Sequence, residues 1–176
     1  MESPKRYHPL LVAIHWIMAI LILFNLLYAT FAMVRIPNDA GKAPVLMVHM
    51  LTGLTVLGLV IVRFIVRLTT KLPPAATSGS KLLDVLGVVI HWTLYLAAFG
   101  MGLSGLGLAL QSGLFGSVFA GQGQIPVDFY EFGPRISHGF LATALYVVIG
   151  LHVAAALFHE IIRKDRLMRR MWFGKR

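Results

Sequence analysis

The sequence predicts an all-α fold: an integral membrane bundle of four helices with both termini in the cytoplasm. Hydrophobic residues make up 57% of the 176 residues and charged residues only 13%, and the mean hydropathy is +0.77. A chain of this composition has too little polar surface to cover a water-soluble globule. We therefore expect residues 1–176 to form a single transmembrane domain in contact with membrane lipid.

Four long apolar runs predict the spanning helices. Each supplies the roughly 20 residues that a helix needs to cross a bilayer, provided that the second run continues through Arg63 with its side chain snorkelling to the interface. The first run lacks the short apolar core and small-residue cleavage site of a signal peptide, so we expect it to be retained. The predicted spans cover residues 10–34, 45–67, 82–110 and 136–162.

The distribution of basic residues predicts the orientation. Thirteen of the sixteen lysines and arginines flank the spans on the side of the two termini, and only Arg35, Lys42 and Arg135 fall on the other side. By the positive-inside rule, both termini are then cytoplasmic. Anionic lipid headgroups are sufficient partners for the net charge of +9, so we expect no nucleic-acid binding.

The outer connection between the third and fourth spans is long and mixed in composition. Residues 111–134 combine glycines with the aromatic side chains of Phe115, Phe119, Phe129 and Tyr130. The segment is therefore expected either to fold back as a lid over the outer end of the bundle or to form a mobile, solvated loop.

Five histidines lie inside or at the edges of the apolar runs, where an ionisable side chain is costly and by default marks a functional site. His138 and His152 share the fourth span at a separation of 14 residues. On a helix this separation is within about 40° of four full turns and rises about 21 Å, so both imidazoles point from one face at two depths. Two planar haem groups stacked across the bilayer would require this geometry. Because the chain has no cysteine, any haem is held by histidine and packing alone.

Depth in the membrane pairs the histidines. His49 in the second span lies at about the outer level of His138, so these two residues can share one iron. His15 in the first span and His152 both belong to the inner half, so they can share a second iron.

Spacing alone leaves the inner pair open. His159 lies seven residues beyond His152 on nearly the same helix face, and His91 also lies in the inner half. For His159 and His91, a structural role beside the ligands and contact with a quinone are the alternatives.

Each predicted span also carries a short motif around its histidine. These motifs are His15-Trp16 in the first span, Val48-His49 with Gly53, Arg63 and Arg67 in the second, His91-Trp92 with Tyr95 in the third, and Ser137-His138 with Gly150-Leu151-His152 in the fourth. Together they resemble the bacterial cytochrome b561 family over essentially the whole chain. That family is similar in architecture to the di-haem membrane subunits of formate dehydrogenases and hydrogenases.

The resemblance implies two haem b groups in a multi-pass protein of the bacterial inner membrane. His15 and His152 would hold the inner haem, and His49 and His138 the outer one. Ligation by two imidazoles leaves no axial position open for activating dioxygen, so transfer of single electrons is the expected chemistry. Within the family, the chain looks like the superoxide oxidases, which implies a membrane oxidoreductase that oxidises superoxide outside and reduces ubiquinone.

Charge and position suggest further site residues. Arg135 and Lys42 lie near the outer ligands and would attract the superoxide anion, while a quinone would accept electrons near His159, His91 and Lys81 at the inner end. Two other functions stay open. The chain could be the haem-bearing subunit of a larger dehydrogenase or hydrogenase with a soluble partner, or a transporter that uses its histidines as a relay.

Overall fold

The computed structural model describes residues 5–75, 77 and 79–174. Regular structure within this part of the chain is helical, with four long helices, one short helix and several single turns. The helices are α1 (Pro9–Phe31), α2 (Ala43–Thr69), α3 (Lys81–Gln111), α4 (Leu114–Phe119) and α5 (Gly133–Leu157). With their adjoining turns, the four long helices form stretches apolar enough to cross a membrane, namely Pro9–Arg35, Ala40–Thr69, Lys81–Gln111 and Gly133–Arg163. The predicted all-α membrane fold is confirmed, although Lys175 and Arg176, two of the basic residues used to predict orientation, lie outside the described residues.

Three of the long helices begin with a proline in their first turn. Pro9 is the first residue of α1, and Pro44 and Pro134 are the second residues of α2 and α5. Proline suits these positions because the first N–H groups of a helix have no intrahelical partner and its φ already matches the helix. The side chain of His8 adds a cap to α1 by accepting a hydrogen bond from the Leu10 N–H at 3.2 Å.

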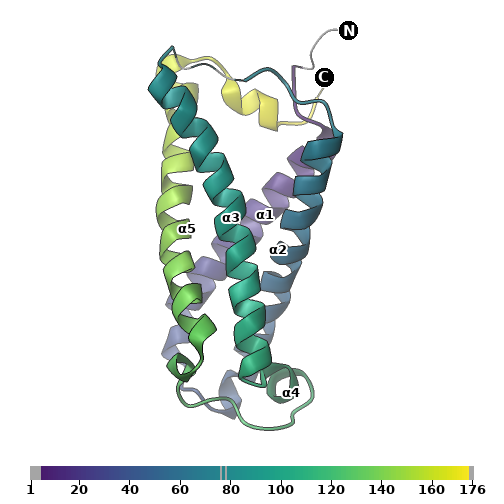
Figure 1. Cartoon of the computed structure of the whole chain (residues 1–176), viewed down its shortest axis with the longest axis vertical. Coiled ribbons are helices and arrows are strands. Elements are labelled where there is room, and N and C mark those ends of the chain that lie inside the picture. Colours follow the sequence, from purple (N-terminus) through teal and green to yellow (C-terminus); the bar gives the residue numbers. More distant parts are fainter. Residues whose placement is uncertain (1–4, 76, 78, 175–176) are drawn as a thin grey trace.

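The long helices form an elongated bundle. Helix α3 packs along α5, α1 packs along α2, and contact between α2 and α3 joins the two pairs. Figure 1 shows α4 at one end of the bundle and both chain termini at the other. We refer to these as the α4 end and the terminal end.

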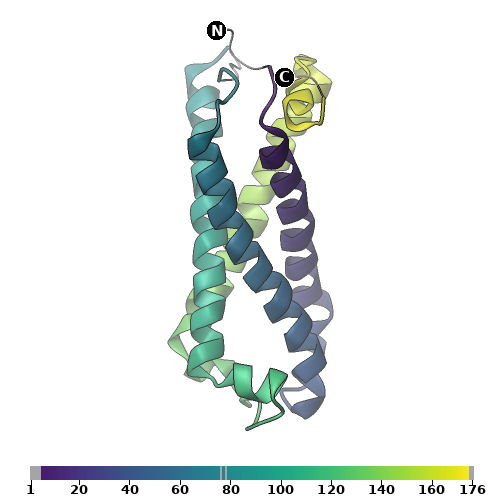
Figure 2. The same ribbon diagram turned by 90° about the vertical axis from the view of Figure 1, so that its right-hand side faces the viewer.

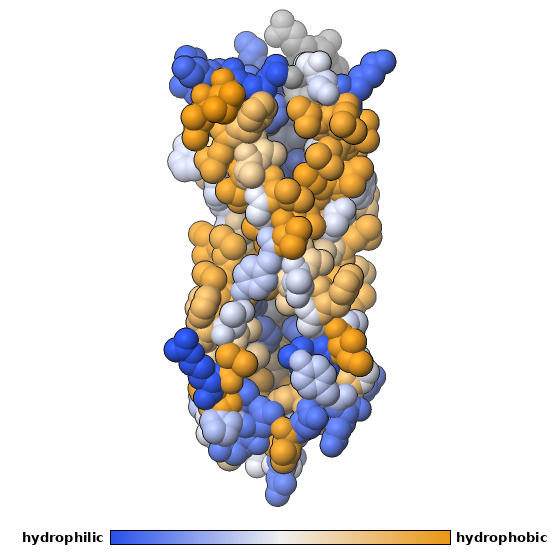
Figure 3. Space-filling model, turned by 90° about the vertical axis from the view of Figure 1, so that its left-hand side faces the viewer, coloured by the Kyte–Doolittle hydropathy of each residue, from blue (hydrophilic) through white to orange (hydrophobic). Residues whose placement is uncertain are grey.

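Apolar side chains cover the outside of the bundle. Large residues such as Ile20 and Leu96 are 65% and 71% exposed, and Figure 3 shows side chains of this kind as a broad belt between two polar ends. An apolar belt of this kind is suited to contact with lipid, which agrees with the predicted membrane-spanning fold.

The interior between α1, α2 and α3 is closely packed around Ile14, Met18, Leu57 and their neighbours. Gly102 on α3 allows α2 to approach, because a Cβ at this position would lie 2.8 Å from the Cβ of Leu57. This glycine therefore serves helix packing, as small residues commonly do in membrane bundles.

Residues 167–173 form a strap across the terminal end, beside the start of α1 (Figures 1 and 2). Four consecutive backbone carbonyls of the strap accept hydrogen bonds from the N-terminal part of the chain. The donors are the Tyr7 N–H to Arg170, the Trp16 Nε1–H to Met171, and the Arg6 guanidinium to Trp172 and Phe173. The strap is thereby tied to α1 next to His15.

Candidate cofactor sites

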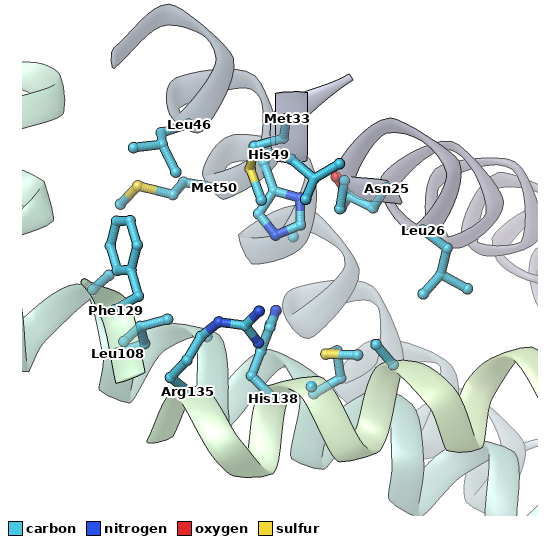
Figure 4. Close-up of a pocket in the computed structure, with 18 of the residues that line it drawn as sticks. Asn25, Leu26, Met33, Leu46, His49, Met50, Leu108, Phe129, Arg135 and His138 are labelled. Carbon is cyan, nitrogen blue, oxygen red and sulfur yellow. The ribbon is translucent and has the colours of Figure 1, made fainter. Parts of the chain in front are cut away.

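Two histidines face each other in the half of the bundle nearest the α4 end. His49 on α2 and His138 on α5 have ring centroids 6.0 Å apart and ring planes at 78°. Figure 4 shows the two rings pointing toward one another across a cavity. Nδ1 of His138 lies 3.1 Å from the hydroxyl oxygen of Ser104 on α3, so Nε2 is the ring nitrogen left for a ligand. Nδ1 of His49 is buried and has no hydrogen-bond partner within the described part of the chain.

Helix α3 also fixes the position of the His138 ring by close packing. A Cβ at Gly105 would lie 3.1 Å from Cε1 and 3.4 Å from Nδ1 of His138, whereas non-bonded carbon atoms prefer about 3.5–4.0 Å. Gly105 therefore makes room for the imidazole itself.

The cavity between His49 and His138 has a volume of about 1050 Å³. Its walls come from α1, α2, α3 and α5 and from the segments that close the α4 end. Pockets for small ligands typically measure about 300–1,000 Å³, so this cavity has room for a group as large as a porphyrin.

Arg135 and Lys42, the two cations proposed from the sequence, line the cavity on its α4-end side. The guanidinium of Arg135 lies 4.8 Å from the ring centroid of Tyr130, and Figure 4 shows it beside His138. Lys42 is only 7% exposed, and its Nζ donates hydrogen bonds to the Ile36 carbonyl at 2.9 Å and to Oδ1 of Asn38 at 2.6 Å. The charged group of Lys42 therefore lies within the wall of the cavity and not on the outer surface of the protein.

The segment between α3 and α5 folds back over the α4 end. Leu114 and Val118 of α4, together with Ile125, are buried against Leu46 and Ala109. These packed side chains agree with the predicted lid, whereas residues 119–124 are exposed, as the alternative of a solvated loop predicts.

A second histidine pair lies in the terminal half of the bundle. His15 on α1 and His152 on α5 have ring centroids 6.2 Å apart, with ring planes at 69°. His91 on α3 is also close, with its ring centroid 5.1 Å from that of His152, and its Nδ1 lies 2.6 Å from the Gly87 carbonyl oxygen. The structure thus brings three of the predicted residues together at one level, and helical rise places that level about 21 Å from His138.

His159 forms a pair with Asp165 beyond the end of α5. Nδ1 of His159 lies 2.6 Å from Oδ2 of Asp165. A π-helical turn, Phe158–Arg163, is followed by a chain reversal in which Lys164 and Arg166 have φ values of 56° and 58°. Left-handed backbone is uncommon outside glycine, and π turns occur frequently at functional sites.

The Asp165 carboxylate is held in its charged form. Burial acts to raise its pKa, but the hydrogen bond and charge of His159, with the Leu167 N–H and Arg163, lower the pKa below its usual value. Lys81 lies at the same end of the molecule, exposed in the first turn of α3. His159, Asp165 and Lys81 thus all lie at the terminal end of the molecule.

The prediction from sequence omits two histidine partners, Ser104 and Asp165. Ser104 gives a usable signal, because it is a hydroxyl within an otherwise apolar run. Asp165 gives none, because its six-residue separation from His159 does not bring side chains together on an α-helix. Only the π turn and the reversal make that contact.

Comparison with known proteins shows the family to which the chain belongs. The family model described as prokaryotic cytochrome b561 matches residues 6–174. A probable superoxide oxidase (CybB) of Yersinia pestis is 27% identical over 176 residues, which cover 98% of each chain. Cytochrome b561 homolog 2 of Escherichia coli (strain K12) is 29% identical over 97% of this chain and 93% of its own length. Cytochrome b562 of Cereibacter sphaeroides is 30% identical over 97% of this chain and 98% of its own length.

The matches extend over the four helices and both histidine pairs, and they confirm the resemblance found in the sequence. They imply haem b as the cofactor and electron transfer in the membrane as the function. The chain is therefore a multi-pass membrane protein of the prokaryotic cytochrome b561 family.

Proposed function

We propose that the chain binds two haem b groups, one between His49 and His138 and one between His15 and His152. The observation that carries this proposal is the separation within each pair, with ring centroids at 6.0 and 6.2 Å. An imidazole nitrogen binds a metal at about 2 Å, and the centre of the imidazole ring lies about 1 Å beyond that nitrogen. Two imidazoles that bind one iron from opposite sides would therefore have their ring centres about 6 Å apart. Both pairs fit this spacing.

When bound, haem b supplies a one-electron redox centre. His49 and His138 would hold one haem and His15 and His152 the other, and ligation by two imidazoles would leave no position open for binding dioxygen. Helix α5 holds the two sites about 21 Å apart along its axis, and buried apolar side chains of the four long helices, among them Met18, Leu57, Ala98 and Leu145, lie between them. This arrangement favours transfer of single electrons from one face of the membrane to the other.

We assign the terminal end to the cytoplasm of a bacterial cell and the α4 end to the outside of its inner membrane. The support is the concentration of basic residues at the terminal end. Superoxide is the proposed electron donor at the α4 end. It is a small anion, Arg135 and Lys42 bring positive charge to the cavity there, and one relative carries the name of a probable superoxide oxidase.

Ubiquinone is the proposed electron acceptor at the terminal end. Reduction of a quinone to a quinol consumes two protons with two electrons, so its site needs groups that exchange protons. The His159–Asp165 pair is such a group, and His91 lies against the ligand His152. Lys81 adds an exposed cation at the same end.

Superoxide-dependent reduction of a short-chain ubiquinone by the purified protein tests this function. Superoxide added by rapid mixing should reduce the haem, as followed in its α band, and the electrons should then appear in the quinone. Superoxide dismutase should abolish both signals. A haem reduced no faster than free haem in the same detergent, together with co-purification of a soluble subunit, would favour the dehydrogenase-subunit function instead. A preparation without a Soret band would favour the transporter.

A further inference from the structure

Arg63 places a positive charge inside a membrane-spanning helix. Its guanidinium donates a hydrogen bond to the carbonyl oxygen of Leu11 on α1. Among the described residues no carboxylate forms an ion pair with Arg63, and the ion pairs of Asp165 lie beyond the C-terminal end of α5. A charge at this depth is costly unless an anion or a set of acceptors accompanies it.

The position of Arg63 along α2 points to the histidine pair of the terminal end. Arg63 follows His49 by 14 residues, the same separation as between His138 and His152 on α5. Helical geometry therefore places Arg63 on the same face as His49 and at the level of His152. Its charge acts on both His15 and His152, and Leu11, its hydrogen-bond partner, lies one turn from His15 toward the terminal end.

Tyr95 on α3 completes a cluster of donors around this charge. The guanidinium carbon of Arg63 lies 5.9 Å from the centre of the Tyr95 ring. The Tyr95 hydroxyl is buried, and its own proton has no acceptor within the described part of the chain. A buried hydroxyl without an acceptor is rare in proteins. Arg63 and Tyr95 thus offer adjacent N–H and O–H donors beside His15.

We propose that Arg63 and Tyr95 bind a propionate carboxylate of the haem held by His15 and His152. The inference rests on the proposed function, because it requires a haem at the terminal end. A guanidinium matches a carboxylate in shape and charge, and hydrogen bonds between ionised partners are the strong ones. The site thereby gains the anion that balances Arg63 and an acceptor for Tyr95.

The test compares Arg63→Gln with Arg67→Gln in the purified holoprotein. Arg67 is a matched control, because it lies on the same helix one turn beyond Arg63. Loss of Arg63 should speed haem loss from the terminal-end site to apomyoglobin by at least about tenfold, since a hydrogen-bonded charge is removed. It should also lower the midpoint potential of that haem, because a nearby positive charge favours the reduced form. The haem of the α4 end serves as an internal reference, and Arg67→Gln should leave both quantities as in the wild type.

Infrared spectroscopy identifies the anion directly. In redox difference spectra of protein with ¹³C-labelled haem propionates, the labelled carboxylate bands should shift in Arg63→Gln and in Tyr95→Phe but not in Arg67→Gln. Labelled bands that stay unchanged while haem is lost faster would overturn the proposal, because the anion would then be another group such as a lipid phosphate. If Arg63→Gln does not fold, Arg63→Lys keeps the charge without the forked geometry and should give smaller shifts of the same sign.

The outcomes separate this inference from the proposed function. A wild-type protein that holds one haem contradicts the two-haem function and removes the basis of the inference. A wild-type protein that holds two haems, with Arg63→Gln indistinguishable from Arg67→Gln, overturns only the role of Arg63.

Discussion

Replacement of Gly105 by alanine should disturb the haem at the α4 end while the fold survives. The new Cβ would lie 3.1 Å from Cε1 of His138, inside the preferred carbon–carbon distance of about 3.5–4.0 Å. The ring must therefore move away from α3 by a few tenths of an ångström. This movement also lengthens the 3.1 Å contact between His138 Nδ1 and the Ser104 hydroxyl.

The expected magnitude follows from these two changes. A strained side-chain rotamer costs about 0.5–1.5 kcal/mol, and loss of a hydrogen bond costs about 0.5–1.5 kcal/mol. Together they amount to about 1–3 kcal/mol, or roughly 5- to 150-fold in haem affinity. The free energy of unfolding should change less than the free energy of haem binding. Alanine is favoured over glycine in a helix by about 0.8–1.0 kcal/mol, and this gain offsets part of the strain in the folded protein.

Haem transfer to apomyoglobin and low-temperature EPR of the ferric protein measure the effect. Gly105→Ala should speed the loss of one haem and shift one of the two low-spin signals. Gly87→Ala is the matched control, since it lies on the same helix and a Cβ there meets no atom within 4 Å. Gly102→Ala, where the Cβ would meet Leu57 at 2.8 Å, should lower thermal stability by forcing α2 and α3 apart. If Gly105→Ala behaves like Gly87→Ala in both assays, the reasoning about the His138 ring is refuted.

Three further predictions test other parts of the account. His49→Ala should remove only the α4-end haem and His15→Ala only the terminal-end haem, as judged by visible and EPR spectra; loss of the same haem in both would show that the pairing is wrong. The rate of haem reduction by superoxide should fall with ionic strength, since charges are screened over about 10 Å at 0.1 M salt, and it should fall further in Arg135→Glu; a rate insensitive to both changes would exclude steering. Because the pKa of Asp165 is lowered in the folded protein from its ordinary 3.8, its carboxylate contributes stability above about pH 4 that is lost as the pH falls through the lowered value. Acid titration of Trp172 fluorescence should therefore show a loosening step that is missing in Asp165→Asn, and identical profiles would mean that the His159–Asp165 pair does not hold the strap.

The fold is largely predictable because the bilayer imposes a simple requirement on the sequence. A spanning helix needs about 20 apolar residues and satisfies its own backbone, so uncharged runs reveal the long helices. The ends of the helices follow from local signals such as Pro44 and Pro134. The strap of residues 167–173 could not be predicted in the same way, because its partners Tyr7 and Trp16 lie at the opposite end of the sequence.

The histidine pairs illustrate what spacing can and cannot decide. The 14-residue separation of His138 and His152 gives two levels directly, but spacing does not decide which histidines form the inner pair, because His159 follows His152 on nearly the same helix face and His91 also lies in the inner half. The structure brings both His15 and His91 within 6.2 Å of His152, measured between ring centroids.

Side chains that reach across the bundle lie beyond what a local pattern can predict. Lys42 bonds to the Ile36 carbonyl through a particular loop conformation, and Arg63 turns into the bundle interior toward α1. The sequence predicts only that Lys42 lies near the outer ligands and that the Arg63 side chain snorkels to the interface. Their contacts depend on how the helices and loops are placed relative to one another.

The number of haem groups per chain is the most direct test of the central claim. A pyridine haemochrome assay on purified, fully loaded protein, combined with amino-acid analysis for the protein concentration, gives this ratio without any assumption about electron donor or acceptor. The two histidine pairs, with ring centroids at 6.0 and 6.2 Å, predict two b-type haems per chain and two low-spin ferric signals in EPR. One haem per chain, or none, would contradict the account.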